Sequence, residues 1–256
     1  MNLLFRLKHY LRYAWQGRTK YYIHSPFVFQ FYLNVLEGDV EQELKPLAQL
    51  RQHLSSNNTS IAVKDFGTGS YKSIAISTLL NKVAVRHKYG KLLYRLVRHY
   101  APSSIIELGT SIGISSAYMG MAAPQAAITS LEGSPDIAIA AGKNHEQLGL
   151  SNIDVQVGNF NQTIPQLLNK LEDVGLVFFD GNHTEEATLQ YFHQFLAKAD
   201  EDSIFVFDDI YWSEGMHAAW QQIKQHPQVT LTIDVYQFGI CFFKKGKTKE
   251  DFILRY

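Results

Sequence analysis

The sequence predicts a doubly wound α/β fold with a helical N-terminal extension. From residue 103 onward, short apolar runs alternate with segments of helix length. This alternation is typical of a mostly parallel sheet that is covered by helices on both faces. Residues 1–87 show helical spacing without such alternation. We therefore expect residues 1–87 to form an extension or lid and residues 88–256 to form the main domain.

The N-terminal elements follow from hydrophobic spacing and capping signals. Leu3, Leu7 and Leu11 recur at helical intervals. Ser25 before Pro26 is typical of a helix start. The remaining elements expected here are helices at 41–54 and 88–100, a polar loop at 55–60 and a glycine-rich turn at 65–70. Its glycines resemble those of the turn at residues 109–113, but no acidic strand end follows it, so a lid loop or a structural turn is expected there.

The main domain is predicted to contain seven strands. The expected parallel strands cover residues 104–108, 127–131, 154–157, 174–179 and 203–207. The expected helices between and after them cover residues 112–122, 135–148, 184–198 and 213–225. Residues 229–235 and 238–243 are too close for a crossover helix, so we expect the last strand to pair antiparallel with the strand before it.

The composition is that of a globular protein. The chain has 256 residues, 46% of them hydrophobic, and its formal net charge is zero. This excludes disordered and fibrous classes. The single Cys241 lies in an apolar run, which excludes an internal disulfide and a cysteine zinc site and predicts a buried thiol. No segment approaches the ~18 apolar residues of a membrane span, and basic residues interrupt any signal peptide, so a cytoplasmic location is expected.

The neutral total conceals a charge asymmetry. Residues 1–100 carry 15 Lys and Arg against 5 Asp and Glu, whereas the rest carries 9 against 19. A basic half is compatible with nucleic acid, a membrane surface or an anionic substrate, and also with an ordinary solvated helical face.

The first predicted strand leads into a turn with two glycines. Gly109 and Gly113 permit a tight turn and a close approach of the backbone to a ligand at the start of the next helix. Ser111 occupies the place of the second glycine in the dinucleotide fingerprint, which argues against NAD. Because two glycines four apart are weak evidence, a purely structural turn is the alternative.

The next two strand ends extend this candidate nucleoside site. Glu132 ends the second strand, where a carboxylate can accept hydrogen bonds from both ribose hydroxyls. The alternative is a surface Glu at a helix start. Asn159 and Phe160 follow the third strand and suit an adenine edge and ring, or an ordinary turn.

Three carboxylates follow the fourth and fifth strands. Asp180, Asp208 and Asp209 each come after an apolar run, and together they would repel one another without a cation or protons. Oxygen ligands of this kind suit Mg²⁺, Ca²⁺ or Mn²⁺, although one Asp could instead cap the next helix. His183 lies three residues after Asp180 and can act as a proton acceptor or cap a helix. Tyr211 and Trp212 are expected either to stack on an aromatic or sugar ring or to pack the following helix.

Residues 88–245 together resemble class I S-adenosylmethionine-dependent methyltransferases. The segment from Glu107 to Gly113 is similar to the first motif of the family, Glu132 to its ribose-binding acid and Asp180 to its acidic fourth motif. The resemblance implies a Rossmann-like methyltransferase sheet with S-adenosyl-L-methionine as cofactor. The implied cofactor-binding residues are Glu107, Gly109, Thr110, Ser111, Gly113, Ser115, Glu132, Gly133, Ser134, Asn159, Phe160 and Asp180.

The carboxylate set resembles that of the metal-dependent O-methyltransferases. In the catechol type the metal ligands end in Asp-Asn and a Lys follows the first Asp by three residues, whereas Asp209 and His183 stand here. The bacterial sugar and antibiotic type is therefore more similar. The resemblance implies a divalent metal, with Mg²⁺ expected, at Asp180, Asp208 and Asp209. It also implies His183 and Asp180 as catalytic residues and a small-molecule hydroxyl as acceptor.

Two alternatives concern the basic N-terminal region. It could dock RNA or protein as the methyl acceptor, although its basic residues are dispersed and no strong nucleic-acid signal is present. Residues 1–36, with five Lys and Arg and no acid, are also compatible with peripheral membrane contact, including a methyltransferase-like protein without metal. A homodimer is compatible with the sequence.

Overall fold

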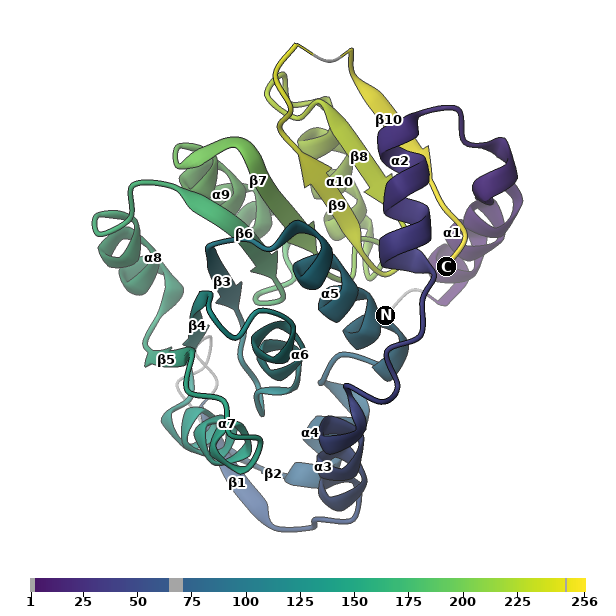
Figure 1. The fold of residues 1–256 in the computed structure, drawn as a ribbon. Coiled ribbons are helices and arrows are strands. Elements are labelled where there is room, and N and C mark those ends of the chain that lie inside the picture. The colour runs from purple at the N-terminus through teal and green to yellow at the C-terminus, as the bar shows by residue number, and fades with distance from the viewer. Residues whose placement is uncertain (1–2, 65–70, 247) are drawn as a thin grey trace. The chain divides into compact units, whose positions relative to one another are not determined.

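A computed structural model describes residues 3–64, 71–246 and 248–256 (Figure 1). The chain divides into two compact units, unit 1 with Met1–Leu33 and Ile164–Tyr256, and unit 2 with Asn34–Thr163. These units do not coincide with the expected division after residue 87, which stays a prediction. The glycine-rich turn at residues 65–70 lies outside the described residues.

Unit 2 contains a parallel three-stranded sheet and a separate antiparallel hairpin. The parallel strands, in the order β3-β4-β5, are β3 (Ser104–Leu108), β4 (Ala127–Glu132) and β5 (Ile153–Val157). The hairpin consists of β1 (Ser60–Lys64) and β2 (Tyr71–Ala75). The helices are α3 (Lys45–Ser55), α4 (Ile76–Lys82), α5 (His87–Tyr100), α6 (Ile114–Ala122) and α7 (Pro135–Gln147). The hairpin was not predicted, because its strands are short and none of the side chains described in them is fully buried.

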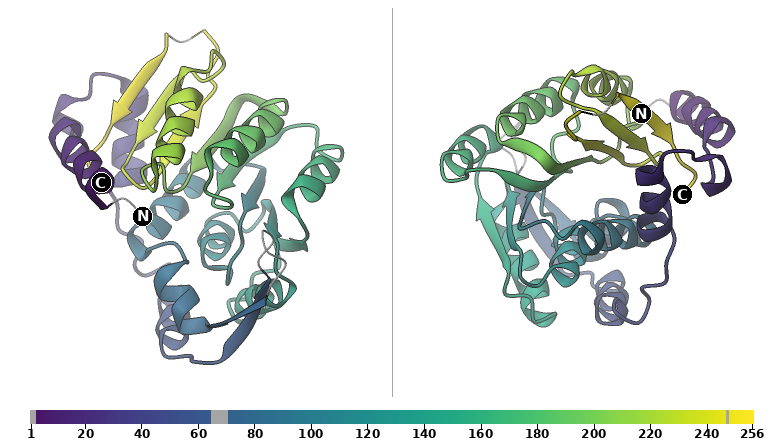
Figure 2. Two further views of the ribbon diagram at one scale, coloured as in Figure 1. Left: turned by 180° about the vertical axis from the view of Figure 1, so that it is seen from behind. Right: turned by 45° about the horizontal axis from the view of Figure 1, so that its top comes forward.

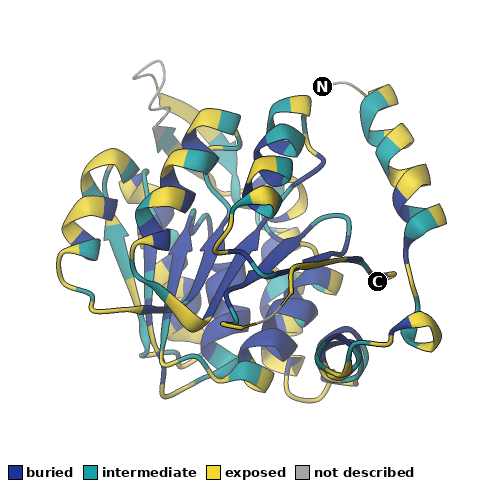
Figure 3. Cartoon of the chain, turned by 90° about the horizontal axis from the view of Figure 1, so that it is seen from above, coloured by how far each residue is buried: buried dark blue, intermediate teal, exposed yellow. Residues whose placement is uncertain are grey.

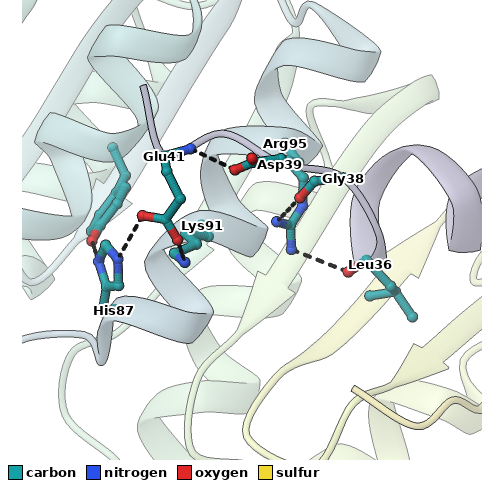
Figure 4. Close-up of polar contacts among 8 residues, drawn as sticks. Leu36, Gly38, Asp39, Glu41, His87, Lys91 and Arg95 are labelled. Carbon is teal, nitrogen blue, oxygen red and sulfur yellow. Dashed lines mark hydrogen bonds and ion pairs between the residues drawn. The ribbon is translucent and has the colours of Figure 1, made fainter. Parts of the chain in front are cut away.

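Helix α5 holds the end of the π-helical turn η2 (Tyr32–Leu36) and the residues just after it through a buried arginine. Arg95 is 4% exposed. Its Nη1 donates to the carbonyl of Gly38 at 3.0 Å and its Nη2 to that of Leu36 at 3.3 Å (Figure 4). Its Nε donates to the carbonyl of Val35 at 2.6 Å. A guanidinium that satisfies three backbone carbonyls compensates its own burial and leaves these acceptors paired.

Unit 1 contains five strands in the order β10-β8-β9-β7-β6. Their bounds are β6 (Val174–Phe179), β7 (Ala199–Phe207), β8 (Leu231–Asp234), β9 (Gly239–Phe242) and β10 (Glu250–Ile253). The helical segments of this unit are α1 (Leu3–Gln16), η1 (Lys20–Tyr22), α2 (Pro26–Phe31), α9 (Glu185–Leu196) and α10 (Glu214–Gln225), while α8 (Phe160–Leu168) includes the chain boundary between the units. Helices α9 and α10 cover one face of these strands and α2 lies on the other (Figures 1 and 2).

The predicted fold class is confirmed, with one strand more than expected. The described residues contain eight strands of a mostly parallel sheet flanked by helices. The antiparallel pairing of β8 and β9 is confirmed, but the last strand is β10, which runs parallel to β8. Strand β10 escaped prediction because the exposed Glu250 and Asp251 precede its one buried side chain, Phe252. Helix α8 was also missed, since Pro165 lies inside it.

The central strands are mostly buried, whereas exposed residues line the outer faces of the helices (Figure 3). Cys241 is buried in β9, as predicted. Helix α1 confirms the predicted first helix. No helix in the part of the chain that the structure describes is long and apolar enough to cross a membrane. The cytoplasmic location stays a prediction.

Candidate functional site

The turn between β3 and α6 requires glycine at two positions. Gly109 has a φ of 99° and Gly113 a φ of 77°, a region that favours glycine. A Cβ atom on Gly113 would lie 2.5 Å from Nε2 of His145. The Gly109 N–H donates to the carbonyl of Leu131 at 2.9 Å, which fastens the turn to β4. The backbone of residues 109–113 is therefore tightly turned and is fixed to β4 directly before the N-terminus of α6.

Glu107, near the end of β3, is completely buried and incompletely hydrogen-bonded. Its Oε2 accepts a hydrogen bond from Ser130 Oγ, whereas Oε1 has no partner among the described residues. Burial raises the pKa of Glu107 to about 7, while hydrogen bonds from Ser115 and Ser130 oppose this shift. A buried acceptor without a partner is costly, so Oε1 is an orphaned atom that a bound polar ligand would satisfy.

Glu132, at the end of β4, is held by backbone groups on both sides. Its Oε2 accepts the Ser111 N–H and its Oε1 accepts the Ser134 N–H, each at 2.9 Å. Burial raises the pKa of Glu132, and these backbone hydrogen bonds oppose the shift. Each carboxylate oxygen has a second lone pair, so this fixed carboxylate can still accept two hydroxyl groups.

The other predicted cofactor residues of unit 2 follow the ends of β3, β4 and β5. Thr110 Oγ1 is hydrogen-bonded to Ser130 Oγ at 2.5 Å. Asn159 is exposed, and its Oδ1 accepts the Asn161 N–H at 2.9 Å, so this side chain helps to start α8 as a turn residue would. Ser115 lies buried in α6, Gly133 follows Glu132 directly, and Phe160 is the first residue of α8.

The three predicted metal ligands lie in unit 1 at the ends of β6 and β7. Asp208 is 5% exposed, and its Oδ1 accepts the Asp209 N–H at 2.7 Å and the Gln237 Nε2 at 3.0 Å. Burial, and then the charge of Asp209, raise the pKa of Asp208 to about 7, while hydrogen bonds with Asp180 and Gln237 oppose the shift. Asp208 therefore stands in a crowded acidic environment that a positive charge would relieve.

His183 lies beside this acidic set. Its Nε2 is 3.5 Å from Oδ1 of Asp180. Burial lowers the pKa of His183, against the opposing effect of the Asp209 charge. The imidazole is therefore neutral near pH 7 and able to accept a proton.

Within residues 3–64, 71–246 and 248–256, no three His, Cys, Asp or Glu side chains are arranged to hold a metal ion. The donor chemistry of Asp180, Asp208 and Asp209 nevertheless fits a hard divalent cation, which prefers carboxylate oxygens. Binding such an ion requires these side chains to turn toward it.

Two residues that hydrogen-bond the site carboxylates were not predicted from the sequence, and the role of a third residue had two alternatives. Gln237, in the β8–β9 connection, donates to Asp208, and Ser130, inside β4, donates to Glu107. Neither has a motif, because only the strand pairing brings it into contact. Tyr211 is buried, stacks on His217 with ring centroids 5.1 Å apart and donates to Asp234 Oδ2 at 2.5 Å. These contacts favour the packing interpretation for Tyr211.

Replacing Glu107 by glutamine is expected to remove the loss of stability that ionisation of the buried Glu107 causes as the pH rises. The folded-state pKa is about 7 against an ordinary value of 4.5, so the folded chain holds a proton that the unfolded chain releases. The contribution of Glu107 to stability should therefore fall as the pH rises from 4.5 through about 7. Glutamine stays neutral, so the advantage of Glu107→Gln should be about 1 to 3 kcal/mol larger at pH 8 than at pH 5.

Urea unfolding at both pH values measures this effect. Glu146→Gln, at an exposed position on α7, is the matched control and should give no pH-dependent difference. An equal advantage of Glu107→Gln at both pH values would contradict the raised pKa.

A family model for a methyltransferase domain matches residues 106–210. This segment is similar to a methyltransferase domain. It starts within β3, ends just after β7 and contains every predicted site residue. The match confirms the resemblance to class I S-adenosylmethionine-dependent methyltransferases.

Curated relatives and solved structures agree with the methyltransferase domain. The chain is 29% identical to a catechol O-methyltransferase of Niastella koreensis, over 50% of this chain and 58% of that protein. It is 28% identical to one of Mycobacterium tuberculosis, over 54% of this chain and 62% of that protein. The chain thus spans about three fifths of the length of these relatives.

The solved structures show the same fold at lower identity. An O-methyltransferase of Bacillus cereus in complex with SAH has a TM-score of 0.59 and 20% identity, covering 86% of this chain and 97% of that one. The O-methyltransferase TomG of Streptomyces achromogenes, in complex with SAM, has a TM-score of 0.59 and 19% identity, covering 85% and 95%.

Proposed function

We propose that the protein transfers a methyl group from S-adenosylmethionine to a hydroxyl oxygen of a small molecule, assisted by a divalent metal, with Mg²⁺ as the expected ion. The observation that carries the cofactor assignment is the carboxylate of Glu132, fixed by the N–H groups of Ser111 and Ser134. The orphaned Oε1 of Glu107 and the glycine-dependent turn support it. The cofactor forms named for the Bacillus and Streptomyces structures agree with this assignment.

The residues of unit 2 would bind and orient the cofactor. Glu132 would accept hydrogen bonds from both ribose hydroxyls, and the backbone of the turn from Gly109 to Gly113 would face the methionine part. Glu107 would satisfy its open acceptor through a polar group of the cofactor or a bridging water. Because the turn is rigid, little ordering is needed when the ligand binds, which favours both affinity and alignment.

The residues of unit 1 would bind the acceptor hydroxyl through a metal ion and accept its proton. A divalent ion held by Asp180, Asp208 and Asp209 would lower the pKa of the acceptor hydroxyl. The neutral His183, oriented by Asp180, would take the hydroxyl proton on a ring nitrogen. S-adenosylmethionine, when bound, would supply the methyl group from its sulfonium to the acceptor oxygen and would leave as the neutral thioether S-adenosylhomocysteine.

Two measurements test this function separately. Isothermal titration with S-adenosylmethionine and S-adenosylhomocysteine should show binding, and no binding at high micromolar concentration would contradict the cofactor assignment. Methyl transfer to catechol, the acceptor in the names of the relatives above, should require added Mg²⁺ and stop in EDTA. Turnover that EDTA leaves unchanged would remove the metal from the mechanism while leaving methyl transfer intact.

A further inference from the structure

Helix α1 has one face that packs on unit 1. Phe5, His9 and Tyr13 recur every four residues on this face, with the Phe5 and His9 rings 6.1 and 4.4 Å from the ring of His217. The Tyr13 hydroxyl donates to the carbonyl of Leu254 at 2.8 Å. These contacts hold the helix in place on unit 1 without using its leucines.

The opposite face of α1 is apolar and exposed. Apart from the adjacent pair at its start, its members follow each other at spacings of three and four residues, which places them on one side of a helix. They are Leu3, Leu4, Leu7, Leu11 and Trp15, with exposed fractions of 71, 79, 51, 60 and 82%. Single exposed leucines are common, but a continuous stripe of large apolar side chains on one helix is typical of an interaction surface.

The charges around this stripe are of one sign. Residues 1–36 contain five Lys and Arg and no acid. Lys8 and Arg12 are exposed and flank the stripe on the helix surface, and Arg18 follows closely. A second copy of α1 would bring the same positive charges against these, so pairing of two such helices is disfavoured. A surface of negative charge over an apolar interior is complementary to both features.

We propose that α1 is an interfacial helix that binds the protein to anionic lipid bilayers, with its leucine face in the acyl region and its basic residues at the headgroups. An exposed Trp15 at one end of the stripe suits the headgroup boundary, where indole rings are enriched. The helix is held on unit 1 by its other face, so it can lie in the plane of the membrane without leaving the fold. This binding is independent of the proposed methyl transfer.

Sedimentation of the full chain with vesicles tests the proposal. The chain should pellet with phosphatidylcholine vesicles that contain about 30% phosphatidylglycerol, and about 0.5 M NaCl should weaken this binding. Pure phosphatidylcholine vesicles should bind it far less. Leu7→Gln with Leu11→Gln, and separately Lys8→Glu with Arg12→Glu, should each weaken binding about tenfold or more.

Matched controls separate a local effect from a general one. Val83→Gln with Ile139→Gln removes two exposed apolar side chains from unit 2, and Lys82→Glu with Lys170→Glu makes the same change in net charge elsewhere. Both control pairs should bind vesicles like the unchanged chain. The emission of Trp15 should shift to the blue on binding, and Trp15→Phe should abolish this shift.

Three outcomes would overturn the proposal. These are no pelleting at low salt, equal pelleting with neutral and anionic vesicles, and vesicle binding that the control pairs reduce as much as the α1 pairs. Self-association that Leu7→Gln with Leu11→Gln abolishes, without vesicle binding, would assign the stripe to a second copy. A salt-dependent shift with bulk RNA, again without vesicle binding, would assign the basic residues to nucleic acid.

Discussion

Asp208→Asn is expected to lower methyl transfer about 100-fold or more while cofactor binding stays nearly unchanged. The substitution removes one proposed metal ligand charge but keeps an oxygen that can accept the Asp209 N–H and the Gln237 amide. Metal assistance contributes several kcal/mol to such reactions, and each 1.36 kcal/mol is a factor of ten in rate. The measurement is the initial rate at several Mg²⁺ concentrations, together with titration of S-adenosylhomocysteine.

Asp202→Asn is the control for this variant. Asp202 is an exposed carboxylate of unit 1 that pairs with Lys244 at 2.5 Å, so its neutralisation should leave the rate unchanged. A rate for Asp208→Asn that equals the rate of the control would remove Asp208 from the reaction. A gain in stability of Asp208→Asn, measured by urea unfolding, is also expected, because the raised pKa shows that the buried charge is unfavourable.

Glu132→Ala is expected to weaken binding of S-adenosylhomocysteine by about 100-fold, since hydrogen bonds to a charged group contribute about 1.5 to 3 kcal/mol each. The same change removes the acceptor for the Ser111 and Ser134 N–H groups, so some affinity is lost through the turn itself. Glu132→Gln keeps one acceptor oxygen and should lie between the alanine variant and the unchanged protein. Isothermal titration gives the three dissociation constants.

Stability and binding must be measured together for this site. Thermal unfolding without ligand reports the loss of the turn, and the exposed Glu146→Gln on α7 should change neither quantity. If Glu132→Ala unfolds early yet binds the cofactor with full affinity, Glu132 only supports the turn and does not contact the ribose.

The helices and strands that could be predicted from the sequence are those with a clear pattern of apolar residues along the whole element. The run from Val174 to Phe179 is apolar throughout, which is the pattern of a strand buried on both faces, and it forms β6 as expected. Strand β10 and the hairpin β1–β2 lie at exposed positions, where burial imposes no alternation. Strand β10 depends on its pairing with β8, and the two strands of the hairpin depend on pairing with each other, which the pattern within a single strand does not encode.

The same distinction holds for the candidate site. Residues at strand ends, such as Glu132 and Asp180, could be found because the ends of parallel strands gather ligand contacts. Gln237 could not, because it contacts Asp208 from a connection 29 residues later in the chain. The interpretation of Asn159 as an adenine contact stays a prediction beside its observed role in the turn that starts α8.

The attachment of α1 bears on the order in which the chain folds. The Tyr13 hydroxyl donates to Leu254 across 241 residues, and the Tyr256 N–H donates back to the same hydroxyl at 2.9 Å. During synthesis the helix leaves the ribosome well before Leu254, which lies 241 residues later in the chain. Until then both the leucine face and the face of Phe5, His9 and Tyr13 are uncovered, so α1 can meet a lipid surface before it packs in its own fold.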